Sequence, residues 1–171
     1  AVAALSTTQV RALLSDQVGA LSSDQLVAMG TAQMGALSAA QVAAMNSMQT
    51  AAIETQDLAA MSTLALRAMQ TDSLAALNTA QIQALTSAEV ANLTTAQVQA
   101  LTSDQIGALR TAHAFALSTA QLTSLSTAQL QSLSTADFAA LGTTALRALS
   151  SAQVAALTTD QVIALTTAQA A

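Results

Sequence analysis

The chain has 171 residues and a net charge of −5, and it is 53% hydrophobic but only 1% aromatic and 8% charged, with no cysteine and no proline. The four basic residues form no basic segment that could follow a phosphate backbone, so we expect no nucleic-acid partner. Polar clusters interrupt every apolar stretch well before the roughly 20 residues needed to cross a bilayer, so we expect no membrane insertion. Without cysteine there is neither a disulfide framework nor a thiolate metal site.

An aliphatic anchor residue stands at every eighth position from Leu5 to Leu165, without one insertion or deletion. Numbered from this anchor, the octad reads Leu, Ser/Thr, Ser/Thr, Ala/Asp, Gln, aliphatic, variable, Ala. Self-similarity at a fixed short period is the signature of a repeat architecture. We therefore expect residues 1–171 to form a single octapeptide-repeat solenoid and to be a segment of a longer array.

Each octad contains a signal for the start of a helix. Position three is Ser or Thr in twenty of the twenty-one octads and is followed by good helix formers, which is typical of an N-cap. Position two is often a hydroxyl residue as well, and its spacing to the glutamine fits a capping box, so either hydroxyl could be the cap. One continuous helix is excluded, because the leucine stripe would rotate by about 80° per octad and leave no continuous apolar face.

These patterns predict an all-α solenoid of very short helices, one per octapeptide, each held by packing against its neighbours. An octapeptide β-solenoid is the alternative, since an even period keeps a strand in register. It is disfavoured because the repeated positions hold Ala and Gln instead of β-branched residues.

A longer period predicts the size of one coil. Position seven is mostly small in odd octads and mostly large in even octads, and position two of even octads holds Gly30, Asn46, Asn78 and Gly142, which suit a left-handed residue closing the preceding helix. We therefore predict a coil of two octads (16 residues), a miniature αα-hairpin, and this period argues against three octads per coil. A four-octad helical coil remains a second alternative.

Three positions are expected to form the core: the anchor, the aliphatic residue at position six and the alanine at position eight. The glutamine at position five, present in fourteen octads, is expected to bond the unpaired groups that every short helix leaves at its ends. His113 replaces one of these glutamines. With no second His and no Cys it makes a poor metal site and lacks a nucleophile partner, so we expect no metal, no cofactor and no catalytic residue.

The variable residues at position seven of even octads are the candidate binding site. In a 16-residue coil they would line one ridge along the solenoid: Arg67, Gln83, Gln99, Phe115, Gln131 and Arg147. Repeat proteins often present binding residues in this way, although a solvated ridge without a ligand would look the same. The segment with Asp57 and Arg67 recurs eighty residues later with Asp137 and Arg147, and each pair is a candidate ion pair.

The octad resembles the Leu-Ser/Thr-x-x-Gln-Val/Ile/Leu-x-Ala octapeptide arrays of large proteobacterial secreted or surface proteins, described as exoproteins or adhesins. Residues 101–108 (LTSDQIGA) and 157–164 (LTTDQVIA) show the resemblance best, whereas residues 45–76 depart from the pattern. The resemblance implies an extracellular or cell-surface location, and it supplies no catalytic residue.

We therefore expect a structural scaffold or spacer in a large extracellular bacterial protein, and not an enzyme. The alternative is a repeat binding module that recognises a glycan or a protein along the even-octad ridge. Apolar edges near Val2 and Val162 also predict end-to-end self-association.

Overall fold

The computed structural model describes residues 2–166 and 169, and within these residues it contains twenty α-helices of four to six residues, one 3-10 turn and no strand. The prediction of one short helix per octad is confirmed, and the β-solenoid alternative is wrong. The helices, after the 3-10 turn η1 (Val2–Ala4), are α1 (Thr7–Ala12), α2 (Ser15–Gly19), α3 (Ser23–Val27), α4 (Thr31–Met34), α5 (Ala39–Ala43), α6 (Ser47–Ala51), α7 (Thr55–Leu58), α8 (Thr63–Ala68), α9 (Thr71–Ala75), α10 (Thr79–Ala84), α11 (Ser87–Asn92), α12 (Thr95–Ala100), α13 (Ser103–Gly107), α14 (Thr111–Ala116), α15 (Thr119–Ser124), α16 (Thr127–Ser132), α17 (Thr135–Ala139), α18 (Thr143–Arg147), α19 (Ser151–Ala155) and α20 (Thr159–Ile163).

Position two of the octad is the N-cap, and position three is the first helical residue. At α13 the Thr102 hydroxyl accepts from the Gln105 backbone N–H at 3.2 Å, and Gln105 Oε1 accepts from the Thr102 N–H at 2.8 Å. This reciprocal capping box satisfies two of the amides that a helix start leaves unpaired. It is repeated at most helices, so the sequence marks most helix starts locally.

The predicted left-handed role of Gly and Asn at position two is wrong. Gly30 and Asn46 have φ of −85° and −89° and lie in the extended region as N-caps. The Asn46 side chain accepts from the Gln49 backbone N–H at 3.0 Å, which makes it a substitute for Ser or Thr. No described residue has a positive φ.

Three octads, not two, make one coil. Every substantial helix–helix contact in the described chain joins helices that are three apart in the sequence, such as α5 with α8 and α8 with α11. A coil therefore has 24 residues, and the predicted 16-residue coil and the four-octad alternative are both wrong. The helices form three stacks, which we call stack 1 (α1, α4, α7, α10, α13, α16, α19), stack 2 (α2, α5, α8, α11, α14, α17, α20) and stack 3 (η1, α3, α6, α9, α12, α15, α18).

The corners between helices explain the triangular coil. Between α12 and α13, Leu101 (φ −62°, ψ 139°) and Thr102 (φ −70°, ψ 161°) are both extended. A tight reversal into an αα-hairpin is commonly made with a left-handed residue after the helix, and the described chain contains none. Two extended residues instead turn the chain partway, as in motifs whose helices meet at about 90–120°, and three such corners close one turn.

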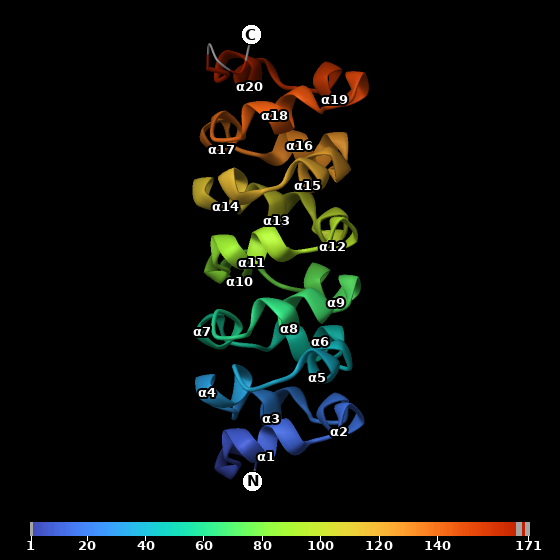
Figure 1. Cartoon of the computed structure of the whole chain (residues 1–171), viewed down its shortest axis with the longest axis vertical. Helices are drawn as coiled ribbons and strands as arrows, with labels where there is room; N and C mark the ends of the chain where they lie inside the picture. The colour runs from blue at the N-terminus through green and yellow to red at the C-terminus, as the bar shows by residue number, and fades with distance from the viewer. Residues whose placement is uncertain (1, 167–168, 170–171) are drawn as a thin grey trace.

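The molecule is an elongated stack with its two termini at opposite ends (Figure 1). The helices of stack 2 do not lie directly above one another. In Figure 1 this stack runs from the right side at α2 through the front at α8 to the left side at α14 and α17. The coils are therefore rotated progressively, and the whole array is a superhelix.

One continuous core runs inside the stacks and is built from the anchor and position six of most octads. In the coil at the middle of the chain, for example, Leu101 is 4% exposed and Ile106 is fully buried. The alanines at position eight were predicted to share this core, but only Ala36 among those described is buried. The glutamines at position five take their place, because Gln105 is 2% exposed.

Backbone hydrogen bonds do not hold the coils together. Outside the helices, each backbone–backbone hydrogen bond found in the described residues spans three or four positions and belongs to a helix end or a corner. The polar links between coils are made by side chains.

Candidate functional site

The glutamine at position five joins two helices. Gln105 begins α13, where its Oε1 completes the capping box, and its Nε2 donates toward the carbonyl oxygens of Leu77 at 2.6 Å, Leu74 at 3.1 Å and Ala75 at 3.2 Å. These carbonyls lie at the C-terminal end of α9, where a helix leaves acceptors without partners. One amide thus satisfies the start of one helix and the end of another in the coil before.

The same arrangement recurs along the array and forms what we call the glutamine ladder. Each Nε2 donates to carbonyls 28 to 31 residues earlier, at distances of 2.6 to 3.5 Å, and the ladder comprises Gln33, Gln41, Gln49, Gln81, Gln97, Gln105, Gln121, Gln129, Gln153, Gln161 and Gln169. The predicted structural role of these glutamines is confirmed. Their burial was not predicted, because glutamine side chains are mostly exposed in folded proteins.

His113 replaces a ladder glutamine and reproduces both of its bonds. Its Nδ1 accepts from the Arg110 N–H at 3.3 Å, and its Nε2 lies 2.8 Å from the Leu85 carbonyl, 28 residues earlier. Both bonds require the neutral ring with its hydrogen on Nε2, since Nδ1 must accept. The imidazole therefore replaces the glutamine amide. Its Nδ1 takes the place of the glutamine Oε1, and its Nε2 takes the place of the glutamine Nε2.

The surroundings of His113 favour this neutral form. Burial lowers the pKa of His113 below its ordinary 6.5 and the Arg110 guanidinium lowers it further, whereas the hydrogen bond to Leu85 and the Asp137 carboxylate raise it. Arg110 Nη2 lies 3.1 Å from the His113 Nε2 and also donates to Leu85 O at 3.0 Å. The ring is thus fully occupied in a structural role.

The candidate ridge is divided among the three stacks. The side chains of all six residues are exposed, as expected for a surface position. Because residues sixteen apart are only two thirds of a coil apart, the structure places them in three pairs: Arg67 with Phe115 in stack 2, Gln83 with Gln131 in stack 1, and Gln99 with Arg147 in stack 3. The single ridge is not formed, and each pair is separated by two coils.

The candidate ion pairs are not formed among the described residues. Asp57 is 3% exposed in stack 1, whereas Arg67 is exposed in stack 2. Asp137 is 5% exposed and accepts from the hydroxyls of Thr111 at 2.8 Å and Ser134 at 2.5 Å. Eighty residues equal three and one third coils, so the two copies of this segment lie in different stacks.

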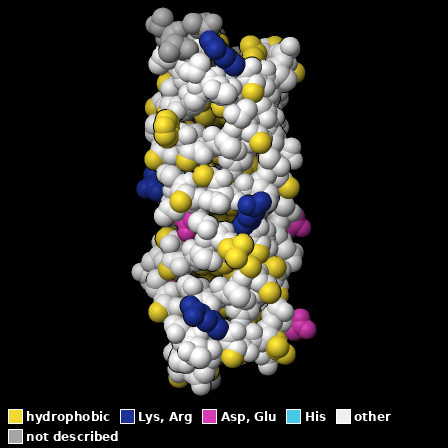
Figure 2. All heavy atoms as spheres, viewed as in Figure 1, with side chains coloured by type: hydrophobic (Ala, Val, Ile, Leu, Met, Phe, Trp, Pro, Cys, Tyr) yellow, Lys and Arg dark blue, Asp and Glu magenta, His cyan; other side chains and the backbone are white. Residues whose placement is uncertain are grey.

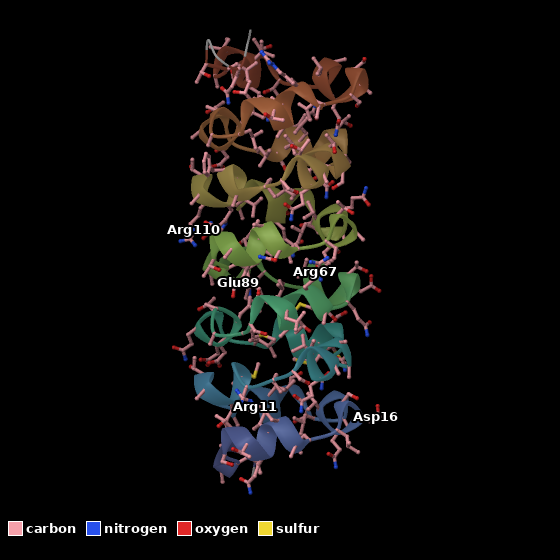
Figure 3. The ribbon with its side chains drawn as sticks, in the orientation of Figure 1. Arg11, Asp16, Arg67, Glu89 and Arg110 are labelled. Carbon is pink, nitrogen blue, oxygen red and sulfur yellow. The ribbon has the colours of Figure 1, made fainter. Side chains whose placement is uncertain are left out.

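The surface carries isolated charges without a charged patch on the face drawn in Figure 2. Figure 3 shows Arg11, Arg67 and Arg110 at the surface of separate coils. Uncharged polar side chains instead line a shallow groove of about 610 Å³ where the α12–α13 corner lies beneath the α15–α16 corner: Gln99, Thr102, Ser103, Ser124, Ser126 and Gln129. A groove with these hydroxyl and amide groups is suited to a polar, uncharged ligand.

No group of three or more His, Cys, Asp or Glu side chains that could hold a metal ion occurs in the described part of the chain. None of the described helices is long and apolar enough to cross a membrane. Neither result changes the conclusion drawn from the glutamine ladder, which is that most buried polar groups join one coil to the next.

The fold and its ladder define an all-α solenoid repeat protein. The model of the ALTTAQ repeat family matches residues 1–31, 20–52, 50–87, 79–111 and 132–167, so the chain belongs to the ALTTAQ repeat family. The motif occurs literally at residues 164–169, where it begins just before an anchor and ends on the ladder glutamine. A search of curated proteins and a search of solved structures each gave no match.

Proposed function

We propose that this chain is a non-catalytic structural spacer, part of a large extracellular or cell-surface bacterial protein. The observation that carries the proposal is the ladder, which joins each coil to the coil before it by the same side-chain bonds along most of the array. The substantial helix–helix contacts in the described chain join each helix to its counterparts in the neighbouring coils. In such an array length grows with the number of repeats while the local structure stays the same.

The use of His113 supports a non-catalytic role. Histidine is the side chain best suited to acid–base chemistry near neutral pH, and it occurs once in the sequence. Both of its ring nitrogens are engaged with backbone groups inside the array, so it is not free to exchange a proton with a substrate. The extracellular location is supported by the resemblance of the octad to secreted proteobacterial arrays.

Deleting octads tests the spacer proposal. Removal of residues 101–124, one whole coil, should leave a folded helical array that is shorter by about 8–10 Å, the distance between packed helices. Removal of one octad, residues 101–108, should shorten it by about a third of that. Small-angle X-ray scattering and circular dichroism measure both effects, and a variant that unfolds or keeps its length would contradict the proposal. Antibody labelling of intact and permeabilised cells tests the location.

A binding module for a glycan or a protein is the second candidate, and the groove beside Gln129 favours it. Its hydroxyl and amide lining would match a carbohydrate, and Phe115, which is 73% exposed, supplies an aromatic ring that a sugar could stack on elsewhere on the surface. A glycan array tests this function. Ser126→Arg should abolish binding in the groove, and Phe115→Ala with Arg67→Ala should abolish binding that uses the position-seven residues.

End-to-end association remains a proposal for the chain in isolation. In the first coil Gln9, Gln17 and Gln25 are exposed, and their Nε2 groups have no acceptor among the described residues. At the other end Val162 is 51% exposed and an apolar hollow of about 310 Å³ is lined mainly by aliphatic side chains. In a longer array adjacent octads would cover both surfaces. Sedimentation over a concentration series would contradict association if the chain stays monomeric throughout.

A further inference from the structure

Asp57 stands out among the buried polar groups of the described chain. It occupies position five of its octad, where the ladder has glutamine, and its side chain is 3% exposed. Its Oδ1 is the one buried side-chain oxygen or nitrogen in the described residues without a hydrogen-bond partner. A buried carboxylate oxygen without a partner costs several kcal/mol unless some other group compensates it.

The 24-residue coil identifies the groups that face this position. Gln81 lies one coil later in the same stack, and its Nε2 is 2.7 Å from Ile53 O and 3.2 Å from Ala51 O. The residues at the same offsets before Asp57 are Met29 and Val27, at the C-terminal end of α3. No hydrogen bond among the described residues ends on the carbonyl oxygen of either. The end of α3 therefore lacks the donor that a ladder glutamine would supply.

All the groups at this position are acceptors. An aspartate is one methylene shorter than a glutamine, so its carboxylate cannot extend as far toward the end of α3 as a ladder amide would. The C-terminal end of a helix carries a partial negative charge, which repels a carboxylate. A carboxylate and backbone carbonyls without a donor are the ligands that hard cations prefer. Helix C-terminal ends and free backbone carbonyls also coordinate sodium in transporters.

We propose that Asp57 and the carbonyl oxygens of Val27 and Met29 bind a sodium ion between α3 and α7. The single carboxylate balances one positive charge, so a monovalent ion leaves the site neutral. The ion replaces the ladder amide and joins the two helices through its oxygen ligands. This site is independent of the proposed spacer function.

The other buried carboxyl groups at position five differ in a way that singles out Asp57. Glu89 Oε2 accepts from the Thr86 N–H at 2.6 Å, and Asp137 accepts from the hydroxyls of Thr111 and Ser134. Each of these carboxylates has donors from the protein itself. A cation is therefore needed at α7 and not at α11 or α17.

Thermal unfolding of the whole chain in sodium chloride and in choline chloride at equal ionic strength tests the site. Sodium should stabilise the wild type, raising the folded-to-unfolded ratio about tenfold when its concentration is about ten times its Kd. Hydrogen exchange in α3 and α7 should slow in sodium more than in the rest of the chain, and sodium NMR should show line broadening by the protein.

Three variants make the test specific. Asp57→Gln restores the ladder amide, so it should raise the unfolding midpoint in choline chloride and remove the sodium response. Asp57→Asn keeps the size of the side chain without its charge and should also remove the response. Asp72→Asn changes an exposed acid in α9 and should keep it. Equal midpoints of the wild type in the two salts would overturn the proposal in favour of a bound water, as would a sodium response that survives in Asp57→Gln.

Discussion

Replacing one ladder glutamine with a side chain of similar shape should measure the strength of the link between coils. Gln105→Met keeps the length and apolar stem of the side chain and removes its polar atoms. The change deletes a bond of 2.6 Å to the buried Leu77 carbonyl and the capping bond of 2.8 Å to Thr102. Leaving a buried carbonyl without a donor costs about 1–3 kcal/mol, and losing a helix cap costs about 1 kcal/mol. We therefore expect a loss of about 2–4 kcal/mol.

Gln25 provides the matched control for this change. The segment Ser23–Gln25 has the same sequence as residues 103–105, and Gln25 Oε1 makes the same capping bond, at 2.8 Å to Ser22 N. Its Nε2, however, has no acceptor in the described residues. Gln25→Met should therefore cost only the capping term of about 1 kcal/mol. The difference between the two variants isolates the bonds between coils.

The assay has to report on single coils as well as on the whole array. Urea unfolding followed by far-UV circular dichroism suits a chain with no Trp or Tyr. Native-state hydrogen exchange adds the local free energy of opening at α13 and α9, since repeat arrays can open unit by unit. Gln99→Met, on an exposed glutamine, controls for the change of residue type. If Gln105→Met destabilised α13 no more than Gln25→Met destabilises α3, the ladder would not be what holds the coils together.

Four further predictions follow from the same geometry. Because burial lowers the pKa of His113 in the folded state, the unfolded chain takes up the proton first, and stability should fall as the pH drops below about 6.5. In urea titrations His113→Gln should remove this loss of stability. An unchanged pH profile in this variant would contradict the assignment of the loss to His113. A Cβ on Gly35 would lie 2.8 Å from the Ala60 carbonyl oxygen. Gly35→Ala should therefore destabilise the folded chain by about 1–3 kcal/mol instead of giving the usual gain in a helix. A raised urea midpoint would show that the neighbouring backbone moves to accommodate the methyl group. About seven coils, each rising about 8–10 Å, should give a scattering length of about 55–70 Å, whereas a length of about 90–105 Å would restore the 16-residue coil. Leu101→Ala should cost about 2–5 kcal/mol and speed hydrogen exchange in the coils on either side of it before it lowers the stability of the distant ones.

The helices could be predicted from the sequence because their boundaries depend on residues within one octad. Thr102 and Gln105 form the capping box across three positions, and Leu101 next to them marks the corner. Such short-range signals are present in most octads, so one helix per octad followed directly. The choice between positions two and three for the cap could not be made, because both hold hydroxyl residues in most octads.

The number of helices per coil could not be predicted, because it depends on the direction of the corner and not on residue type. At the α12–α13 corner, Leu101 and Thr102 adopt extended conformations that most amino acids can adopt. The alternation at position seven that predicted two octads is a property of exposed residues such as Arg67 and Phe115, which do not direct packing. The predicted single ridge of position-seven residues is not formed, because it was derived from the same alternation.

A signal for the true coil was nevertheless present in the sequence. Four of the seven residues that replace glutamine at position five are spaced by 24: Ala65, Glu89, His113 and Asp137. They belong to four successive helices of stack 2, and the last two of these helices are linked directly, since the Thr111 hydroxyl of α14 donates to Asp137 of α17. Replacements of the position-five glutamine that recur at a spacing of one coil indicate which buried positions are neighbours in adjacent coils.

Within the described residues no backbone hydrogen bond joins two coils, which sets this array apart from solenoids made of strands. In a β-solenoid any sequence can add to the open edge through its main chain, which makes exposed edges prone to templated aggregation. Here an added coil must bring glutamines, or a substitute such as His113, in register with carbonyls 28 residues earlier. Addition of a coil at an end is therefore selective for the octad sequence. The strength of the link between two coils can be adjusted by single substitutions. An array of this kind can thus be lengthened by duplication without binding unrelated chains at its ends.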